Sequence, residues 1–298
     1  MSLNSPIFLM LENALDSYQA WYRQGESLRA EEDLHQALVS YDRALEYHPQ
    51  DYWAHYRKGT ILEDLGNFQD AVQEYIKAAN IKPGNYWAWY QQGCLCLEEL
   101  TEYYQAVACF SQVLINYPED YWATYRLGEA WRKLNDWERA ISYYNKAIQL
   151  RPQDFWSHYR QGEVWQEWNK LDLALRAYDR ALHIKPNDYW AWFHKGVILQ
   201  ELNDSASAIE CYEKALTIDP DAHSTWYQLA SCYVAIDNFN WAIMSLEKAI
   251  DIYPEKYLSL VASDSIWHDL KRRSGFISLV ANKTKKYEPA VGEHKINS

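Results

Sequence analysis

The sequence predicts an all-α fold, a right-handed α-solenoid superhelix of seven stacked helix–turn–helix repeats. Seven of the nine prolines recur every 34 residues, with one interval of 35: Pro49, Pro83, Pro118, Pro152, Pro186, Pro220 and Pro254. A small residue precedes each proline by 24 residues, or by 25 in the third repeat: Gly25, Gly59, Gly93, Gly128, Gly162, Gly196 and Ala230. A fixed period of this length is typical of one supersecondary unit stacked many times.

Two helices fit within each period. Apolar residues between these markers follow spacings of three and four, as in Ile141, Tyr144 and Ile148, which indicates amphipathic helices. Each proline is expected to end a second helix, because proline has no N–H to donate. The small residues should mark where the two helix axes come close. The expected repeats are 18–51, 52–85, 86–120, 121–154, 155–188, 189–222 and 223–256.

The third repeat carries one extra residue near Thr101, because Gly93 and Ala106 are 13 residues apart, whereas the equivalent spacing in the other repeats is 12. We expect this insertion to lengthen the turn between the two helices of that repeat and to leave the stack intact.

The recurring aromatic, glycine, alanine and proline residues together resemble the tetratricopeptide repeat. The resemblance covers residues 18–256. Within a repeat we number the small residue as position 8 and the proline as position 32. The resemblance implies a protein-binding module in which positions 2, 5, 9, 12 and 13 of the first helix face a concave groove.

The two ends of the chain lie outside this pattern. Residues 1–17 are expected to form a leading helix that caps the first repeat. Residues 257–281 are expected to form a capping helix that ends at Gly275 and is followed by a helical turn. The polar residues 282–298 are predicted to be a disordered tail. Closing elements of this kind resemble those of bacterial repeat proteins, which suggests a bacterial origin.

Composition argues against several classes of function. A net charge of −12 with little clustering of lysine and arginine disfavours nucleic acid as a partner. No apolar run approaches 18 residues, so no membrane span is expected. The apolar stretch 7–11 lacks a preceding basic segment and does not suggest a secretory signal. Five cysteines without a C-x-x-C pair fit reduced thiols in a cytoplasmic protein.

The sequence contains no motif for enzyme chemistry. The phosphate-binding glycine loops, the H-E-x-x-H zinc motif and the G-x-S-x-G elbow are all missing from it. The nine histidines do not have metal-ligand spacing. We therefore expect a non-enzymatic protein with no cofactor and no metal.

Repeats two to six open with nearly the same four residues, such as Asp51-Tyr52-Trp53-Ala54. The aspartate or asparagine is an expected N-cap. The tryptophan at position 2 is not required by the repeat family, and repeats one and seven carry Gln19 and Ser224 there. These residues form a predicted tryptophan ladder: Trp53, Trp87, Trp122, Trp156 and Trp190.

Further side chains are expected beside this ladder. Position 5 gives a second aromatic row of Tyr56, Tyr90, Tyr125, Tyr159 and Phe193. Position 6 gives Arg57, Arg126, Arg160 and His194, and position 9 gives Glu129 and Glu163. Tryptophan, tyrosine and arginine dominate binding hot spots. These residues therefore predict a groove for a peptide or protein partner with apolar or aromatic side chains and acidic residues, in the manner of a scaffold.

Two other interpretations stay open at this level. The ladder could stack against sugar rings or another flat small ligand. Alternatively, the tryptophans could pack only on neighbouring helices, so that the chain would be an architectural spacer. The chaperone-tail clamp of the family needs lysine at position 5, where this chain has aromatic residues. The sequence does not specify the oligomeric state.

Overall fold

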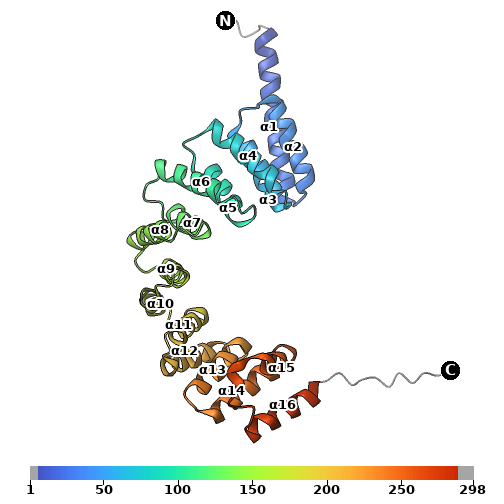
Figure 1. Cartoon of the computed structure of the whole chain (residues 1–298). Helices are drawn as coiled ribbons and strands as arrows, with labels where there is room; N and C mark the ends of the chain where they lie inside the picture. The colour runs from blue at the N-terminus through green and yellow to red at the C-terminus, as the bar shows by residue number, and fades with distance from the viewer. Residues whose placement is uncertain (1–5, 288–298) are drawn as a thin grey trace, which may run out of the picture. The chain divides into compact units, whose positions relative to one another are not determined.

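The computed structural model describes residues 6–287, with side chains from Ala14 onward. Over these residues the chain is helical with no strand, and it divides into two compact units, Met1–Pro152 and Gln153–Ser298. In each unit, successive helices lie beside one another as pairs (Figure 1). The first unit contains α1 (Pro6–Ala30), α2 (Leu34–Tyr47), α3 (Tyr52–Asp64), α4 (Phe68–Ile81), α5 (Tyr86–Glu98), α6 (Tyr103–Asn116), α7 (Tyr121–Lys133) and α8 (Trp137–Leu150).

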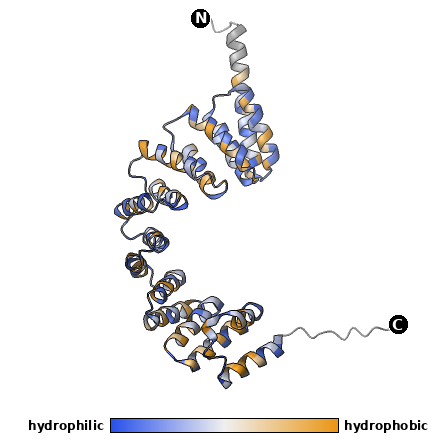
Figure 2. Ribbon diagram, viewed as in Figure 1, coloured by the Kyte–Doolittle hydropathy of each residue, from blue (hydrophilic) through white to orange (hydrophobic). Residues whose placement is uncertain are grey.

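The second unit continues the same arrangement and ends in additional helices. Its elements are α9 (Phe155–Glu167), α10 (Leu171–Ile184), α11 (Tyr189–Glu201), α12 (Ser205–Ile218), α13 (His223–Ala235), α14 (Phe239–Ile252), α15 (Pro254–Ser263), the 3₁₀ turn η1 (Ser265–Trp267) and α16 (Ser274–Tyr287). Hydrophobic and hydrophilic residues alternate along the helices, as amphipathic helices require (Figure 2). The predicted all-helical solenoid of helix pairs is confirmed.

Helix ends follow the sequence markers. Each second helix stops two residues before its proline, as α2 does at Tyr47 before Pro49. Between the helices of each pair lies one residue with positive φ, for example Gly66 at 75°. The N–H of Asn67 then donates to the carbonyl of Leu62 at 2.8 Å, which satisfies the end of α3 in a Schellman motif. In the third repeat this turn is longer by one residue, around Thr101 with φ 56°, as predicted.

The small residue at position 8 lies under an aromatic ring from the second helix. A Cβ atom on Gly196 would approach Cε1 of Tyr212 to 2.6 Å, and one on Gly128 would approach Cε1 of Tyr144 to 2.8 Å. Both rings are fully buried. The seventh repeat has Ala230 at position 8, and there the second helix supplies Leu246 instead of a ring. The small residue is thus required by the ring rather than by contact between helix backbones alone.

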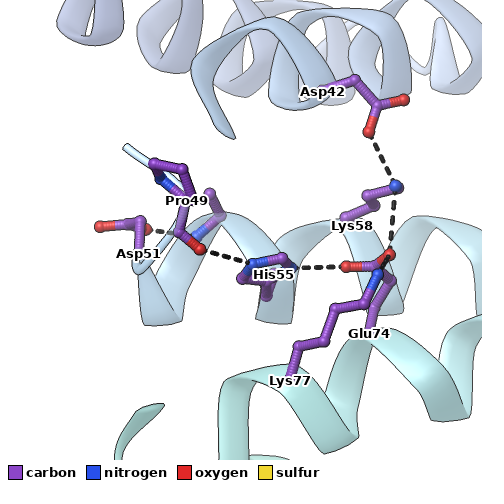
Figure 3. A network of polar contacts seen from close by, with 8 residues as sticks. Asp42, Pro49, Asp51, His55, Lys58, Glu74 and Lys77 are labelled. Carbon is purple, nitrogen blue, oxygen red and sulfur yellow. Dashed lines mark hydrogen bonds and ion pairs between the residues drawn. The ribbon is translucent and has the colours of Figure 1, made fainter. Parts of the chain in front are cut away.

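A buried polar network connects the first two repeats (Figure 3). Glu74 of α4 is 4 % exposed and contacts His55 Nδ1 at 2.6 Å, Lys77 Nζ at 2.9 Å and Lys58 Nζ at 3.1 Å. Lys58 also reaches Asp42 of α2 at 2.7 Å. Burial alone would raise the pKa of Glu74, but these hydrogen bonds and the lysine charge outweigh burial and lower that pKa to about 2.

The N-terminal end differs from the sequence expectation. Residues 6–17 do not form a separate helix, because α1 runs without interruption from Pro6 into the first repeat and ends at Ala30. Of the apolar residues behind that expectation, Ile7 and Leu11 have side chains outside the described part.

The C-terminal elements also differ. Ser274 and Gly275 begin α16 rather than ending a helix, and the preceding α15 already ends at Ser263. Helix α15 ends there because the carboxylate of Asp264 accepts hydrogen bonds from the N–H of Ile266 at 3.0 Å and from the Tyr227 hydroxyl at 2.8 Å.

Helix α16 extends beyond the expected limit at residue 281 and ends at Tyr287. Its last turns are tied to α14, because Lys283 Nζ lies 2.7 Å from Asp251 and the Tyr287 hydroxyl donates to Asp251 at 3.0 Å. The rest of the expected tail, residues 288–298, lies outside the described part.

The packing of ring on glycine predicts a coupled effect on stability. Gly196→Ala should lower the free energy of unfolding by about 1–3 kcal/mol, because the new methyl group overlaps the Tyr212 ring. In a Tyr212→Leu background the same change should be neutral or stabilising, because alanine favours the helix by about 1 kcal/mol. Urea unfolding followed by circular dichroism measures the native chain and the three variants. An equal effect of Gly196→Ala in both backgrounds would contradict this explanation.

The Glu74 network predicts a pH dependence of stability. The folded pKa lies below the unfolded value of 4.5, so the stabilisation is full above pH 4.5 and is lost as the pH falls toward 2. At pH 7 the native chain should exceed Glu74→Gln by up to about 3 kcal/mol in unfolding free energy. Urea unfolding between pH 7 and pH 3 should show this gap narrowing. A gap that is constant with pH would rule out the ionised carboxylate as its source.

Candidate interaction surface

The tryptophan at position 2 stands in the first turn of the first helix in five successive repeats. Its side chain is exposed in every case, by 40 to 57 %. The first unit carries three of these residues and the second unit two: Trp53, Trp87 and Trp122, then Trp156 and Trp190. Large apolar side chains exposed repeatedly at one position are characteristic of interaction surfaces. We call these five residues the tryptophan row.

Neighbouring rings fix the orientation of each indole. Trp53 lies edge-to-face against Tyr52, with centroids 4.9 Å apart, and against Tyr56 at 5.7 Å. Trp190 makes the same two contacts with Tyr189 at 5.0 Å and Phe193 at 6.0 Å. The indoles are therefore packed at the base and open to solvent outward, so that a ligand would order them at low entropic cost.

The second aromatic row predicted from position 5 is mostly internal. Tyr56, Tyr125 and Tyr159 are only 6 to 8 % exposed, whereas Tyr90 and Phe193 are half-buried. Tyr56 contacts the Tyr75 ring, which covers the glycine of its repeat, with centroids 5.6 Å apart. These residues support the tryptophans from below instead of lining the surface beside them.

The arginines at position 6 already form ion pairs within the protein. Arg57 lies 3.2 Å from Glu26, and Arg126 lies 2.6 Å from Glu98 of the preceding repeat and 3.4 Å from Glu129. In the second unit, Arg160 pairs in the same way with Glu163 at 2.7 Å. The glutamates at position 9 thus act as partners of these arginines, and the charge that the arginines present outward is largely compensated.

His194, at position 6 of the sixth repeat, belongs to an aromatic cluster. Its ring stacks on Tyr178 with centroids 5.7 Å apart and also contacts Tyr159 and Trp190. Burial lowers the pKa of His194 below its usual value of 6.5, so the ring is neutral at pH 7. This residue contributes packing and no positive charge.

A second set of basic side chains lies close to the tryptophans, and the sequence interpretation missed it. These residues stand immediately before the proline and reach back over the ring at position 1. The Arg151 guanidinium lies 4.1 Å from the centroid of Tyr121 and 5.5 Å from that of Trp122. Lys82 lies over Tyr52 at 5.5 Å. Their shared place before proline is the signal that could have identified them.

The described residues offer little for catalysis. They contain no group of histidine, cysteine and acidic residues that could hold a metal. All five cysteines are unpaired, and burial raises the pKa of Cys94 and Cys96 to about 12, so these thiols stay protonated at neutral pH. Within residues 6–287, no helix is both long and apolar enough to cross a membrane.

Family models describe much of the repeated part of the chain. Models of the tetratricopeptide repeat match residues 22–86, 97–155, 189–222 and 223–256, together more than half of the sequence. A model of the protein prenyltransferase alpha subunit repeat matches residues 171–202, which span α10 and α11. A comparison with curated proteins yields no match.

Solved structures share the fold at low sequence identity. A tetratricopeptide repeat protein from Parabacteroides merdae is 19 % identical, with a TM-score of 0.60 over 83 % of this chain and 98 % of its own. MamA from Desulfovibrio magneticus is 21 % identical, with a TM-score of 0.53 over 58 % of this chain and 97 % of its own. YrrB, described as having an unusual peptide-binding site, is 23 % identical, with a TM-score of 0.52 over 62 % and 95 % respectively.

Proposed function

Because the chain belongs to the tetratricopeptide repeat family, we propose that it is a non-enzymatic adaptor in which the tryptophans of the row within one unit bind a peptide segment of a partner protein. The observation that carries this proposal is the repeated exposure of an indole by 40 % or more at one position. The fold does not demand that residue, since Gln19 and Ser224 occupy position 2 in the end repeats. A surface of fixed, half-exposed indoles suits a binding role better than a packing role.

The geometry also favours a particular ligand chemistry. Half-exposed indoles can bury apolar or aromatic side chains of an extended segment. The cation best placed to meet an acidic residue is Arg151 beside Trp122, because no described acidic side chain forms an ion pair with it. Arg126 and Arg160, in contrast, are paired with glutamates. The unusual peptide-binding site described for YrrB supports a peptide as the class of ligand.

Substitution within one unit separates binding from folding. A peptide library displayed on phage should select segments that bind the whole chain, and their dissociation constants can then be measured. Trp87→Ala combined with Trp122→Ala should weaken the selected peptides by about 2 kcal/mol or more, roughly 30-fold. Helicity and the thermal midpoint should change little, because both indoles are about half exposed.

The matched control is Tyr104→Ala, since Tyr104 is 73 % exposed in the same unit but outside the tryptophan row. This control should bind as the native chain does. A large drop in the thermal midpoint, with unchanged binding per folded molecule, would instead assign the tryptophans to packing. Oligosaccharides titrated in parallel should not bind, and their binding in place of peptides would overturn the ligand class.

If Arg151 contacts an acidic residue of the ligand, the affinity of an acidic peptide should depend on salt through this side chain. Arg151→Gln should weaken an acidic peptide by about three- to tenfold at low ionic strength and flatten the dependence of its affinity on salt. The control is Arg139→Gln, because Arg139 lies over the Trp131 ring at 4.0 Å and is paired with Asp136. Isothermal titration at low and high salt measures both variants. An identical salt slope in native chain and Arg151→Gln would contradict this assignment.

A further inference from the structure

A recurring ion pair joins neighbouring repeats, between an acid at position 25 of one repeat and a lysine at position 7 of the next. Asp42 meets Lys58 at 2.7 Å in the first unit, and Asp179 meets Lys195 at 2.6 Å in the second. Glu247, the last acid at position 25, meets Lys283 of α16 at 2.9 Å. At these three joints, the protein itself provides the ammonium group.

Glu213 is the remaining acid at position 25, and the contact between repeats at this residue has no lysine. Position 7 of the next repeat is Leu229, which is 3 % exposed. Oε1 of Glu213 accepts a hydrogen bond from the Tyr233 hydroxyl at 2.8 Å. No ion pair to Glu213 is found among the described residues, although its side chain is exposed. The Glu213 carboxylate therefore has no lysine partner at this contact between repeats.

The joint at Glu213 is an aromatic pocket of about 270 Å³. Trp226, Tyr233 and Trp241 line it together with Glu213 and Leu229. The rings of Tyr233 and Trp241 stack at 6.0 Å with an interplanar angle of 26°. The indole N–H of Trp226 is already used, because it donates to the carbonyl of Pro220 at 2.8 Å. The pocket thus offers ring faces and one carboxylate.

The contact between the fifth and sixth repeats shows how an ammonium group binds between a carboxylate and an indole. Lys195 pairs with Asp179 and also lies 5.4 Å from the centroid of Trp192. Trp192 and Trp226 stand at the same position of successive repeats, and each donates its N–H to the proline carbonyl. Glu213 and Trp226 therefore reproduce the carboxylate and the indole that hold Lys195.

Two further positions distinguish the joints. Where the Asp179 pocket has Leu199 and Ser207, the Glu213 pocket has Tyr233 and Trp241. We propose that the Glu213 pocket binds the ammonium group of a lysine side chain from a partner protein. A cation between aromatic faces and a carboxylate gains both cation–π attraction and ion pairing. This site shares no residue with the tryptophan row, so either proposal can fail without the other.

The experiment observes the indole N–H signals of Trp226 and Trp241 by NMR, assigned with Trp226→Phe and Trp241→Phe. Acetyl-lysine amide, with a free side-chain ammonium, is titrated into the whole chain, and acetyl-norleucine amide is the neutral comparison. The lysine compound should shift both signals saturably, and the norleucine compound should not. Equal shifts with both compounds, or no saturable shift with lysine, would overturn the proposal.

Two substitutions test the Glu213 carboxylate and position 7, where this repeat has Leu229 instead of a lysine. Glu213→Gln should weaken the lysine compound at least about tenfold, because Glu213 is exposed and its loss removes the charge without disturbing the core. Leu229→Lys should abolish binding by placing an internal ammonium where Lys195 stands at the preceding joint. Asp179→Asn is the matched control and should leave binding unchanged. Unaltered affinity in Glu213→Gln would overturn the proposal even if Leu229→Lys fails to fold.

Discussion

The contact on which the rest of the structure depends is the aromatic ring of the second helix lying on the glycine of the first. Rings such as Tyr75, Tyr144 and Tyr212 are fully buried at 2.6 to 2.8 Å from the place where a Cβ would stand. This contact sets the spacing of the helix pair. It also gives the tyrosine at position 5 a buried surface to pack against, and that tyrosine in turn supports the tryptophan at position 2. The packed interior of each repeat thus supports the exposed tryptophan, although the fold does not require a tryptophan at that position.

Charge is arranged so that few cations near the tryptophan row are left for a partner. Arg57 and Arg126 are satisfied by glutamates, and several joints between repeats are closed by internal ion pairs. In a chain with a net charge of −12, a basic side chain without an acidic partner is available to attract an acidic group of a ligand. Arg151 beside Trp122 is one such place, and the converse case is the carboxylate of Glu213 without a lysine. Both stand out by comparison with the ion pairs found elsewhere in the chain, such as Asp42 with Lys58 and Asp179 with Lys195.

The sequence was sufficient for the fold, because the proline and glycine period determines where helices end and where rings must pack. It predicted a row of tryptophans at position 2, where the family does not require this residue, but it left open whether they pack on neighbouring helices; their exposure is seen only in the structure. It could not show that Tyr125 is buried, because the burial of this side chain depends on its contact with the Tyr144 ring of the second helix. Nor could it show that Arg126 pairs with Glu98, which lies in the preceding repeat. The terminal helices α15 and α16 fall outside the period, and there Asp264 and Asp251 decide the boundaries through contacts distant in sequence.

The central claim is that a partner covers the tryptophans of the row within one unit. Hydroxyl-radical footprinting with mass spectrometry, applied to the free chain and to its complex with a selected peptide, tests this claim most directly. The five tryptophans are exposed in the free chain, so each should be oxidised readily. Binding should protect those of the row that the peptide covers, while Tyr104 keeps its free-state rate. A stable complex in which every tryptophan of the row is oxidised as fast as in the free chain would contradict the account.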